Sequence, residues 1–456
     1  MPASAEVLAM PGVWETDAEW RRLKGELVAW RKRRVAADPS GQHHSQLEAT
    51  HGLVDGVLER LHGPIAAMSG VGAHVAEACR VHDRRLAWLR RLWSFLRDRF
   101  DQRDDPTLGP VLRAADEVVW SCYRQPFASL GPHGDGLAGP PPLPFVEPVL
   151  TPEVFPQGLV PGELRRDVDA PFLRSALEQL PFAVVRVPAS CATAPWWLVH
   201  LGHEVGHVID AQLLGAADRA RIVEGCGLDD DATGAWTRWS GETFADVYAA
   251  LMHGPWALWA LSTAEAQDPV GLAQRRDSYP PPVVRLLAMA HALDCVGAPL
   301  DDLQAEIAHW QQMVDADASL MAMTAAGRLV VEGLVAHRVR RTSWVDLAAW
   351  VPAAWSRTAL TPRGRQIATR PATPDPRPQR WWVRAAVAAA VLRRRDADAN
   401  SQAATFDGER LGADLLAWLP ALREGGTRSR GAVSTAVIDA QCAALARDLM
   451  DAEPLP

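Results

Sequence analysis

Residues 203–207 constrain this chain of 456 residues more than any other segment. They read His203-Glu204-Val205-Gly206-His207, and apolar residues flank them on both sides. In a helix the two histidines lie one turn apart on the same face, so both imidazoles can bind one metal ion. Glu204 lies beside them, where it can accept a proton from water instead of binding the metal. The pattern therefore predicts a buried helix that carries a zinc site of the hydrolytic kind.

The residues around this motif favour a helix. Pro195 suits a first-turn position, with Thr193 or Ser190 as the capping residue, and no proline interrupts residues 196–214. The competing interpretation is a helix with two core histidines and a solvated glutamate, because so short a motif also arises by chance. A third metal ligand elsewhere in the chain would separate the two interpretations.

The third ligand does not come from the residues directly after the motif. The extended form H-E-x-x-H-x-x-G-x-x-H needs a Gly and a His at positions where this chain has Asp210 and Leu213. A glutamate on a later helix is the other solution. Residues 239–250 predict such a helix, with Ser240 as its N-cap.

Glu242 and Asp246 lie four residues apart in this second helix and share one face. Glu242 is placed to bind the metal, and Asp246 to accept the ring N–H of a ligand histidine and so fix its tautomer. An E-x-x-x-D pair is often only a solvated helix face. Here the surrounding residues are mostly apolar and the pair follows the histidine motif closely, which favours the metal site.

HEVGH followed by GETFAD resembles the active-site pair of the gluzincin metallopeptidases, the broad group that includes thermolysin-like enzymes. The resemblance covers about residues 180–290. It implies a zincin-like catalytic domain with a small sheet and active-site helices. It also implies Zn²⁺ as the cofactor, His203, His207 and Glu242 as its ligands, Glu204 as the general base, and Asp246 as the partner of a ligand histidine.

Two neighbouring segments agree with this resemblance. Residues 181–188 predict a short strand; in gluzincins an edge strand here pairs with the substrate backbone, although an ordinary sheet strand fits the sequence equally well. Residues 278–285 are similar to the His-Pro…Arg segment that follows the third ligand in some membrane-bound gluzincins, with Tyr279 in place of the His. The Tyr279 hydroxyl could stabilise an oxyanion, and Arg285 could orient it or a ligand carboxylate. The alternative is that the prolines after Tyr279 only shape a helix start.

Other polar residues receive weaker roles. His200 lies three residues before His203 and is expected beside the site or in the core. Residues 229–231 are consecutive aspartates without the spacing of a calcium-binding loop, which predicts a solvated turn. Four further histidines lack ligand spacing and receive no role: His253, His291, His309 and His337.

The composition is that of an ordinary globular protein, with 48% hydrophobic and 22% charged residues. A net charge of −8 does not favour a nucleic-acid binder. Six cysteines without C-x-x-C spacing predict reduced thiols, and neither a signal peptide nor a bilayer-spanning apolar run is evident. We therefore expect a cytoplasmic protein that has no membrane partner.

Changes in composition predict a mainly helical (α+β) protein of several parts. Residues 1–125 are expected to form a helical domain, 126–170 a proline-rich strap, 171–360 the catalytic domain with a helical extension, 361–380 a linker and 381–456 a C-terminal helical region. The strap could lie across the cleft as an inhibitory segment, but a plain linker is the better prediction.

The predicted activity is zinc-dependent hydrolysis of peptide bonds, by an intracellular endopeptidase with a narrow range of protein substrates. Glu204 would accept a proton from water and pass it to the leaving amine. Two alternatives stay open: a non-catalytic interaction protein scaffolded by zinc, and a zinc hydrolase of a non-peptide amide or ester. The helical flanks could also bind a regulatory protein.

Overall fold

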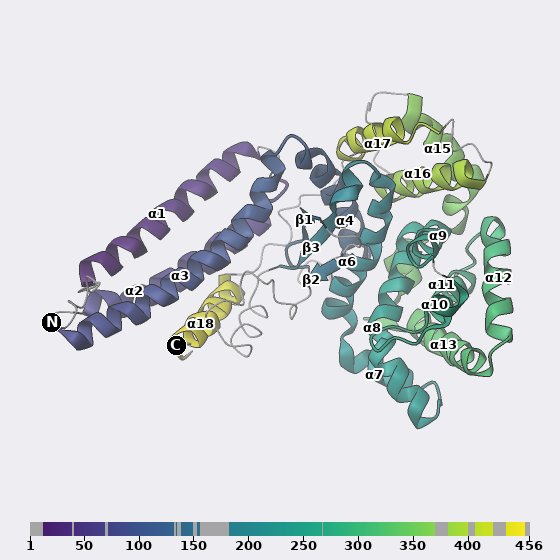
Figure 1. Ribbon diagram of the computed structural model, residues 1–456, viewed down its shortest axis with the longest axis horizontal. Helices are drawn as coiled ribbons and strands as arrows, with labels where there is room; N and C mark the ends of the chain where they lie inside the picture. Colours follow the sequence, from purple (N-terminus) through teal and green to yellow (C-terminus); the bar gives the residue numbers. More distant parts are fainter. Residues whose placement is uncertain are drawn as a thin grey trace, which may run out of the picture. The chain divides into compact units, whose positions relative to one another are not determined.

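The computed structural model describes residues 12–38, 41–68, 72–131, 134, 138–148, 153–155, 182–266, 268–369, 382–399, 406–422 and 435–451. Helices make up most of these residues, and the sheets are small (Figure 1). The expectation of a mainly helical chain with a small sheet is therefore confirmed. The chain divides into two compact units, one formed by residues 1–101, 155–183 and 426–456, the other by residues 102–154 and 184–425.

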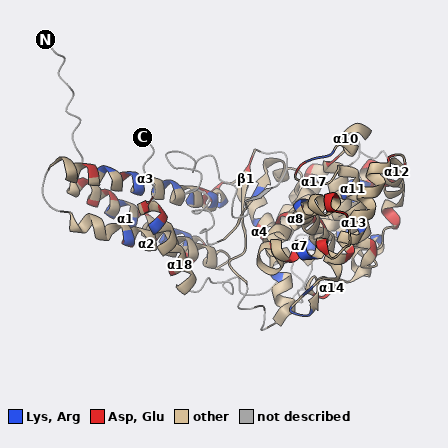
Figure 2. Ribbon diagram, turned by 90° about the horizontal axis from the view of Figure 1, so that it is seen from below, with Lys and Arg blue, Asp and Glu red and all other residues tan. Residues whose placement is uncertain are grey.

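The first unit is built from long helices. α1 (Val13–Ala37), α2 (His44–Ala67) and α3 (Ala73–Asp101) lie side by side, and α18 (Thr435–Asp451) packs on α2 (Figure 1). Ion pairs join the polar faces: Arg90 of α3 bonds to Glu19 and Glu26 of α1, both at 2.8 Å. Acidic and basic residues are interspersed along these helices (Figure 2). Four arginines of α3 pair with acidic side chains: Arg80, Arg84, Arg90 and Arg97.

The second unit holds both segments of the predicted site. The first segment is a run of three helical pieces, η5 (Pro195–His200), α6 (Leu201–Ile209) and η6 (Asp210–Leu214); the second is α8 (Asp230–His253). The remaining helices of this unit include α4 (Leu108–Leu130), α7 (Ala216–Glu224), α9 (Pro255–Ala264), α10 (Pro269–Ala273), α11 (Pro282–Cys295), α12 (Gln304–Asp315), α13 (Ala318–Ala336), α14 (Trp344–Leu347), α15 (Arg357–Thr369), α16 (Trp382–Ala399) and α17 (Gly408–Leu422). β4 (Arg338–Val339) and β5 (Thr342–Ser343) form an antiparallel pair.

The three-stranded sheet consists of β1 (Leu143–Glu147), β2 (Glu153–Phe155) and β3 (Val184–Pro188), in the order β1-β3-β2. β3 runs parallel to β1, with Val184 opposite Leu143. The strand predicted at residues 181–188 is thus present, but it is central. Of the two interpretations, the ordinary sheet strand is confirmed, and an edge strand open to the substrate is excluded because both edges of β3 are already paired. The apolar sequence of β3 indicates burial and carries no information about its neighbours.

α8 begins at Asp230, well before the predicted start. Asp229 is its N-cap, and the Asp229 side chain accepts the backbone N–H of Ala232 at 2.8 Å. The aspartates predicted to form a solvated turn therefore occupy the N-cap and the first turn, where carboxylates complement the helix dipole. Ser240 lies inside the helix and donates to the carbonyl of Thr237, so its predicted role as N-cap is wrong. At η5, Pro195 does stand at the first turn, but no side chain caps it.

The two units divide the chain differently from the predicted domain boundaries. α4 contains Pro126, extends to Leu130 and packs on α6 in the second unit. α18 belongs to the first unit, and α15 occupies part of the segment predicted as a linker. Composition marks breaks along the chain, whereas the units follow from contacts between segments far apart in sequence. Residues 156–170 of the predicted strap lie outside the described residues.

One described helix, α13, is long and apolar enough to cross a membrane, by length and composition alone. Its Leu320, Val330 and Val331 are buried, and it packs on α8 and α11 within the second unit. Core helices meet the same criterion, so α13 is weak support for a membrane span. Among the described residues, no disulfide bond joins any of the cysteines.

α6 and α8 approach each other closely through two glycines. A Cβ atom at Gly206 would lie 2.9 Å from the Cα of Ala245 and 3.2 Å from its carbonyl oxygen. At Gly202 it would lie 2.7 Å from Cδ2 of His253. Contacts under 3.0 Å are essentially never seen for real Cβ atoms, so this helix spacing requires glycine. Each glycine directly precedes one histidine of the motif, and the close contact brings both histidines to α8.

Gly206→Ala should destabilise the second unit, although alanine favours helices. We expect the free energy of unfolding to fall by about 1–3 kcal/mol, since the added methyl group meets backbone atoms of α8. Gly234→Ala is the matched control within α8, because a Cβ there would meet only Arg238 Nη1, at 3.8 Å; it should raise stability by about 0.5–1 kcal/mol. Chemical denaturation followed by circular dichroism measures both changes. Equal effects of the two substitutions would contradict the close contact.

Candidate metal centre

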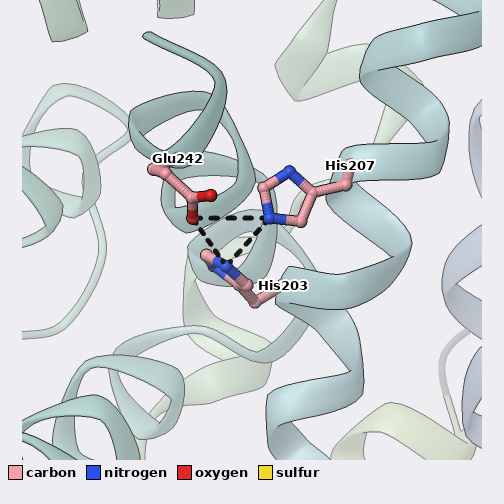
Figure 3. A group of neighbouring side chains, drawn as sticks. All are labelled: His203, His207 and Glu242. Carbon is pink, nitrogen blue, oxygen red and sulfur yellow. Dashed lines mark hydrogen bonds and ion pairs between the residues drawn. The ribbon is translucent and has the colours of Figure 1, made fainter. Parts of the chain in front are cut away.

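Three donor atoms from α6 and α8 converge on one point (Figure 3). Nε2 of His203 lies 3.2 Å from Nε2 of His207, and Oε2 of Glu242 lies 3.3 Å and 3.4 Å from these two nitrogens. Within the described part of the chain, no other group of three His, Cys, Asp or Glu side chains is close enough to share a metal ion. The structure thus brings together the three side chains that the sequence predicts as ligands.

The three atoms have the spacing and the chemistry of a zinc ligand set. Bonds of about 2.0–2.1 Å to a tetrahedral zinc ion place neighbouring ligand atoms about 3.3–3.4 Å apart. Oε2 of Glu242 is buried and accepts no hydrogen bond of good geometry, although both imidazoles lie close to it. A metal ion between the three atoms would satisfy this oxygen. Two histidines and one carboxylate also leave one position open, as in catalytic zinc sites.

A chain of buried polar contacts holds His203. Its Nδ1 lies 2.8 Å from Oδ1 of Asp246, so the ring donates there and presents the lone pair of Nε2 to the centre. Arg285 of α11 donates to both oxygens of Asp246, at 2.6 and 2.9 Å, and to Glu265 at 3.0 Å. Arg276 donates to Glu265 in turn, at 3.0 Å. The contact predicted between Asp246 and a ligand histidine is present, and Arg285 holds that carboxylate in place.

The same groups favour positive charge at the centre. Burial by itself lowers the pKa of His203, but the hydrogen bond and charge of Asp246, with Glu242, outweigh it and raise this pKa to about 10. Burial raises the pKa of Glu242, yet the two imidazoles bring it well below its usual range. The pKa of Asp246 is also lowered, because Arg285 and His203 outweigh its burial. The carboxylates that favour a protonated His203 also attract a divalent cation. The proton and the cation compete for Nε2 of His203.

A cavity of about 540 Å³ lies beside the centre. Its lining includes His203, Glu204 and Asp246. Glu204 is 7% exposed, so its carboxylate is largely shielded from bulk water. It faces the cavity and is not one of the three converging donors. A general base must occupy such a position to accept a proton from water beside a substrate in the cavity.

Tyr279 lines the same cavity from the loop before α11. The Cζ atom of Arg285 lies 5.1 Å from the centroid of its ring, within the range of a cation–π contact. Burial, together with the Glu242 carboxylate, raises the pKa of Tyr279 to about 12, so its hydroxyl is protonated at neutral pH and can donate. Pro282 begins α11 three residues later, so the prolines also have the helix-starting role that was the alternative.

The other histidines have different surroundings. His200 lines the cavity and stacks on Trp197, with 5.8 Å between ring centroids. Burial, with the charges of His203 and Arg285, lowers the pKa of His200 to about 4. His253 is fully buried, and its Nε2 lies 3.6 Å from Sγ of Cys122. The group of converging donors contains none of His253, His291, His309 and His337.

Sequence reasoning missed Glu265 and Arg276. Glu265 follows the last residue of α9 and is 8% exposed, and Arg276 lies in the loop between α10 and α11. The only feature of the sequence that could have indicated a role for Glu265 is its place as a lone glutamate at the end of an apolar helix. No spacing rule connects this residue to Arg285, because the segment between them contains α10 and two irregular connections that set the distance in space.

In comparisons with models of known protein families, with curated proteins and with solved structures, the chain has no significant match. What the centre can do chemically therefore follows from its residues and their geometry.

Asp246→Ala should weaken zinc binding without removing a ligand. The ring N–H of His203 would lose its acceptor, and loss of such a partner typically lowers metal affinity about 10- to 100-fold. Asp246→Asn keeps an oxygen acceptor, so a smaller loss is expected. Competition with a chromogenic chelator gives the affinity, and thermal unfolding of the same samples checks the fold. Unchanged affinity in a folded Asp246→Ala protein would show that this contact does not support the centre.

Proposed function

We propose that this protein hydrolyses peptide bonds with zinc, and that its second unit contains a zincin-like catalytic domain. The observation that carries the proposal is the convergence of two imidazole nitrogens and one carboxylate oxygen, 3.2–3.4 Å apart, with Glu204 beside them on a cavity. A structural zinc site is closed by four protein ligands. Three converge here among the described residues, which supports a catalytic site.

The three ligands would hold the zinc ion between α6 and α8. When bound, zinc would supply Lewis acidity, which polarises a substrate carbonyl and makes water more acidic. Glu204 accepts the proton of the attacking water on a carboxylate oxygen and passes it to the leaving nitrogen. The Tyr279 hydroxyl donates a hydrogen bond to the carbonyl oxygen as that oxygen gains negative charge. Asp246 keeps His203 in the tautomer that presents Nε2 to the metal.

The hydrogen bonds that hold Asp246 beside His203 also favour a catalytic role for the centre. Reacting groups must be held in place by contacts of their own, since small displacements reduce rates. Asp246 receives two hydrogen bonds from Arg285, which Glu265 holds from its other side. Residence in the cytoplasm, a narrow range of protein substrates and a regulatory partner on the helical flanks remain predictions from the sequence.

Purified protein should contain about one zinc ion per chain, measured by atomic emission spectrometry. Glu204→Gln should keep the zinc and lower hydrolysis at least about 100-fold, because an amide cannot accept the proton. Glu224→Gln is the matched control, since this exposed glutamate ends α7 outside the cavity lining, and it should change neither property. Mass spectrometry of cells that express wild type or Glu204→Gln would identify the proteins that are cleaved.

Two results would contradict this proposal. Protein without zinc would exclude the metal site, and a Glu204→Gln protein that cleaves as fast as wild type would exclude the proposed base. Bound zinc without any cleavage that depends on Glu204 would favour the non-catalytic scaffold.

A further inference from the structure

The cavity beside the candidate metal centre has a mixed lining. Apolar side chains such as Trp197 and Leu261 contribute to it. Besides Glu204 and Asp246 at the centre, it contains three charged residues: Glu265, Arg276 and Arg285. This combination suits a ligand group with an apolar stem and a charged end. The sign of that charge follows from the contacts that the charged residues already make.

Glu265 is already neutralised. Its Oε1 accepts from Arg285 at 3.0 Å and from Nη1 of Arg276 at 3.4 Å, and its Oε2 accepts from Nη2 of Arg276 at 3.0 Å. Arg285 is paired in turn with Asp246, so the partly exposed Arg276 is the charge of this cluster that a substrate group can still approach. Coulomb repulsion disfavours a cation beside this guanidinium and favours an anion.

Arg276 is the guanidinium that can still bind a ligand. Arg285 is 8% exposed and donates to both Asp246 and Glu265. The Arg276 side chain is 35% exposed and lines the cavity, and its hydrogen bonds to other described residues go to Glu265 alone. Of its five N–H donors two serve Glu265, which leaves three for a ligand.

We propose that Arg276 binds a carboxylate of the substrate in this cavity, while the apolar side chains of the lining contact the stem that carries it. The planar fork of arginine matches a carboxylate with two parallel hydrogen bonds. The inference rests on the proposed peptidase function and names its substrates: peptides with a carboxylate close to the bond that is cut. That carboxylate belongs to an Asp or Glu side chain or to the C-terminus, and both place the same group on Arg276.

Cleavage of a peptide library tests this preference. Zinc-loaded wild type, Arg276→Gln and Arg275→Gln are incubated with mixed-sequence peptides, prepared once with free and once with amidated C-termini, and the products are identified by mass spectrometry. Arg275 is the matched control, because it is the neighbouring arginine, is exposed and lies over the ring of Trp239. Wild type and Arg275→Gln should prefer peptides with a carboxylate near the cut bond. Arg276→Gln should lower that preference, measured as the ratio of cleavage of peptides with and without the carboxylate, about 10- to 100-fold.

The two forms of the library identify the source of the carboxylate. A preference that disappears on amidation assigns it to the C-terminus. A preference that persists on amidation assigns it to an acidic side chain, and the cleavage sites then give its position relative to the cut bond.

A binding measurement separates a failure of this inference from a failure of the peptidase function. Phenylacetate and phenylacetamide have similar shapes and differ in charge, and each is titrated calorimetrically into zinc-loaded Glu204→Gln protein with and without Arg276→Gln. The acid should lose about 10- to 100-fold in affinity when Arg276 is replaced, and the amide should change little. Arg276→Lys should bind the acid more tightly than Arg276→Gln but less tightly than the protein with Arg276, because lysine keeps the positive charge but lacks the planar pair of N–H donors.

Each contrary result has a distinct meaning. Equal losses for acid and amide would show that Arg276 only maintains the shape of the cavity, and unchanged binding of the acid would show that it does not touch the ligand; either result overturns the inference. Cleavage without preference for a carboxylate also overturns it and leaves the peptidase function intact. If wild type cuts no peptide, the peptidase function fails, and the calorimetric comparison still decides whether Arg276 binds a carboxylate.

Discussion

The candidate metal centre depends on the close contact between α6 and α8. Gly202 and Gly206 lie where α6 touches α8, and each directly precedes one of the two converging histidines. One residue turns a helix by about 100°, so the histidines lie at the edge of this contact and reach Glu242 and Asp246 of α8. A side chain at either glycine would push the helices apart and separate the donor atoms. The distances within the centre are therefore set by the packing of two backbones.

A series of hydrogen-bonded charges of alternating sign runs from His203 through Asp246, Arg285 and Glu265 to Arg276. Asp246, Arg285 and Glu265 are only 4%, 8% and 8% exposed. Burying charges costs free energy, which pairing recovers only with good hydrogen bonds, and an apolar core would be at least as stable. A functional role explains such a network better than stability does, since it orients the His203 imidazole at one end and has the Arg276 guanidinium in the cavity lining at the other.

Most residues of the centre could be predicted because they form pairs within single helices. His203 and His207, like Glu242 and Asp246, lie four residues apart, and such pairs share a helix face whatever the rest of the chain does. The ends of the helices were harder to predict. The start of α8 depends on which of several polar residues caps it, and Asp229 rather than Ser240 does so. Several side chains near a helix start can serve as caps, and only the backbone conformation selects one.

Three features could be predicted from local patterns of residues, because they depend on residues within a few turns of one another: the helical character of the chain, the helix faces that carry the converging donors, and the exclusion of the longer histidine motif. Three others became apparent only in the folded chain: β3 is the central strand, α4 and α18 join different units from those expected, and Glu265 and Arg276 continue the series of contacts that begins at Asp246 and Arg285. These features depend on contacts between segments far apart in sequence. No local pattern of residues records which distant segment will provide the partner, since many segments offer equally apolar or equally charged surfaces.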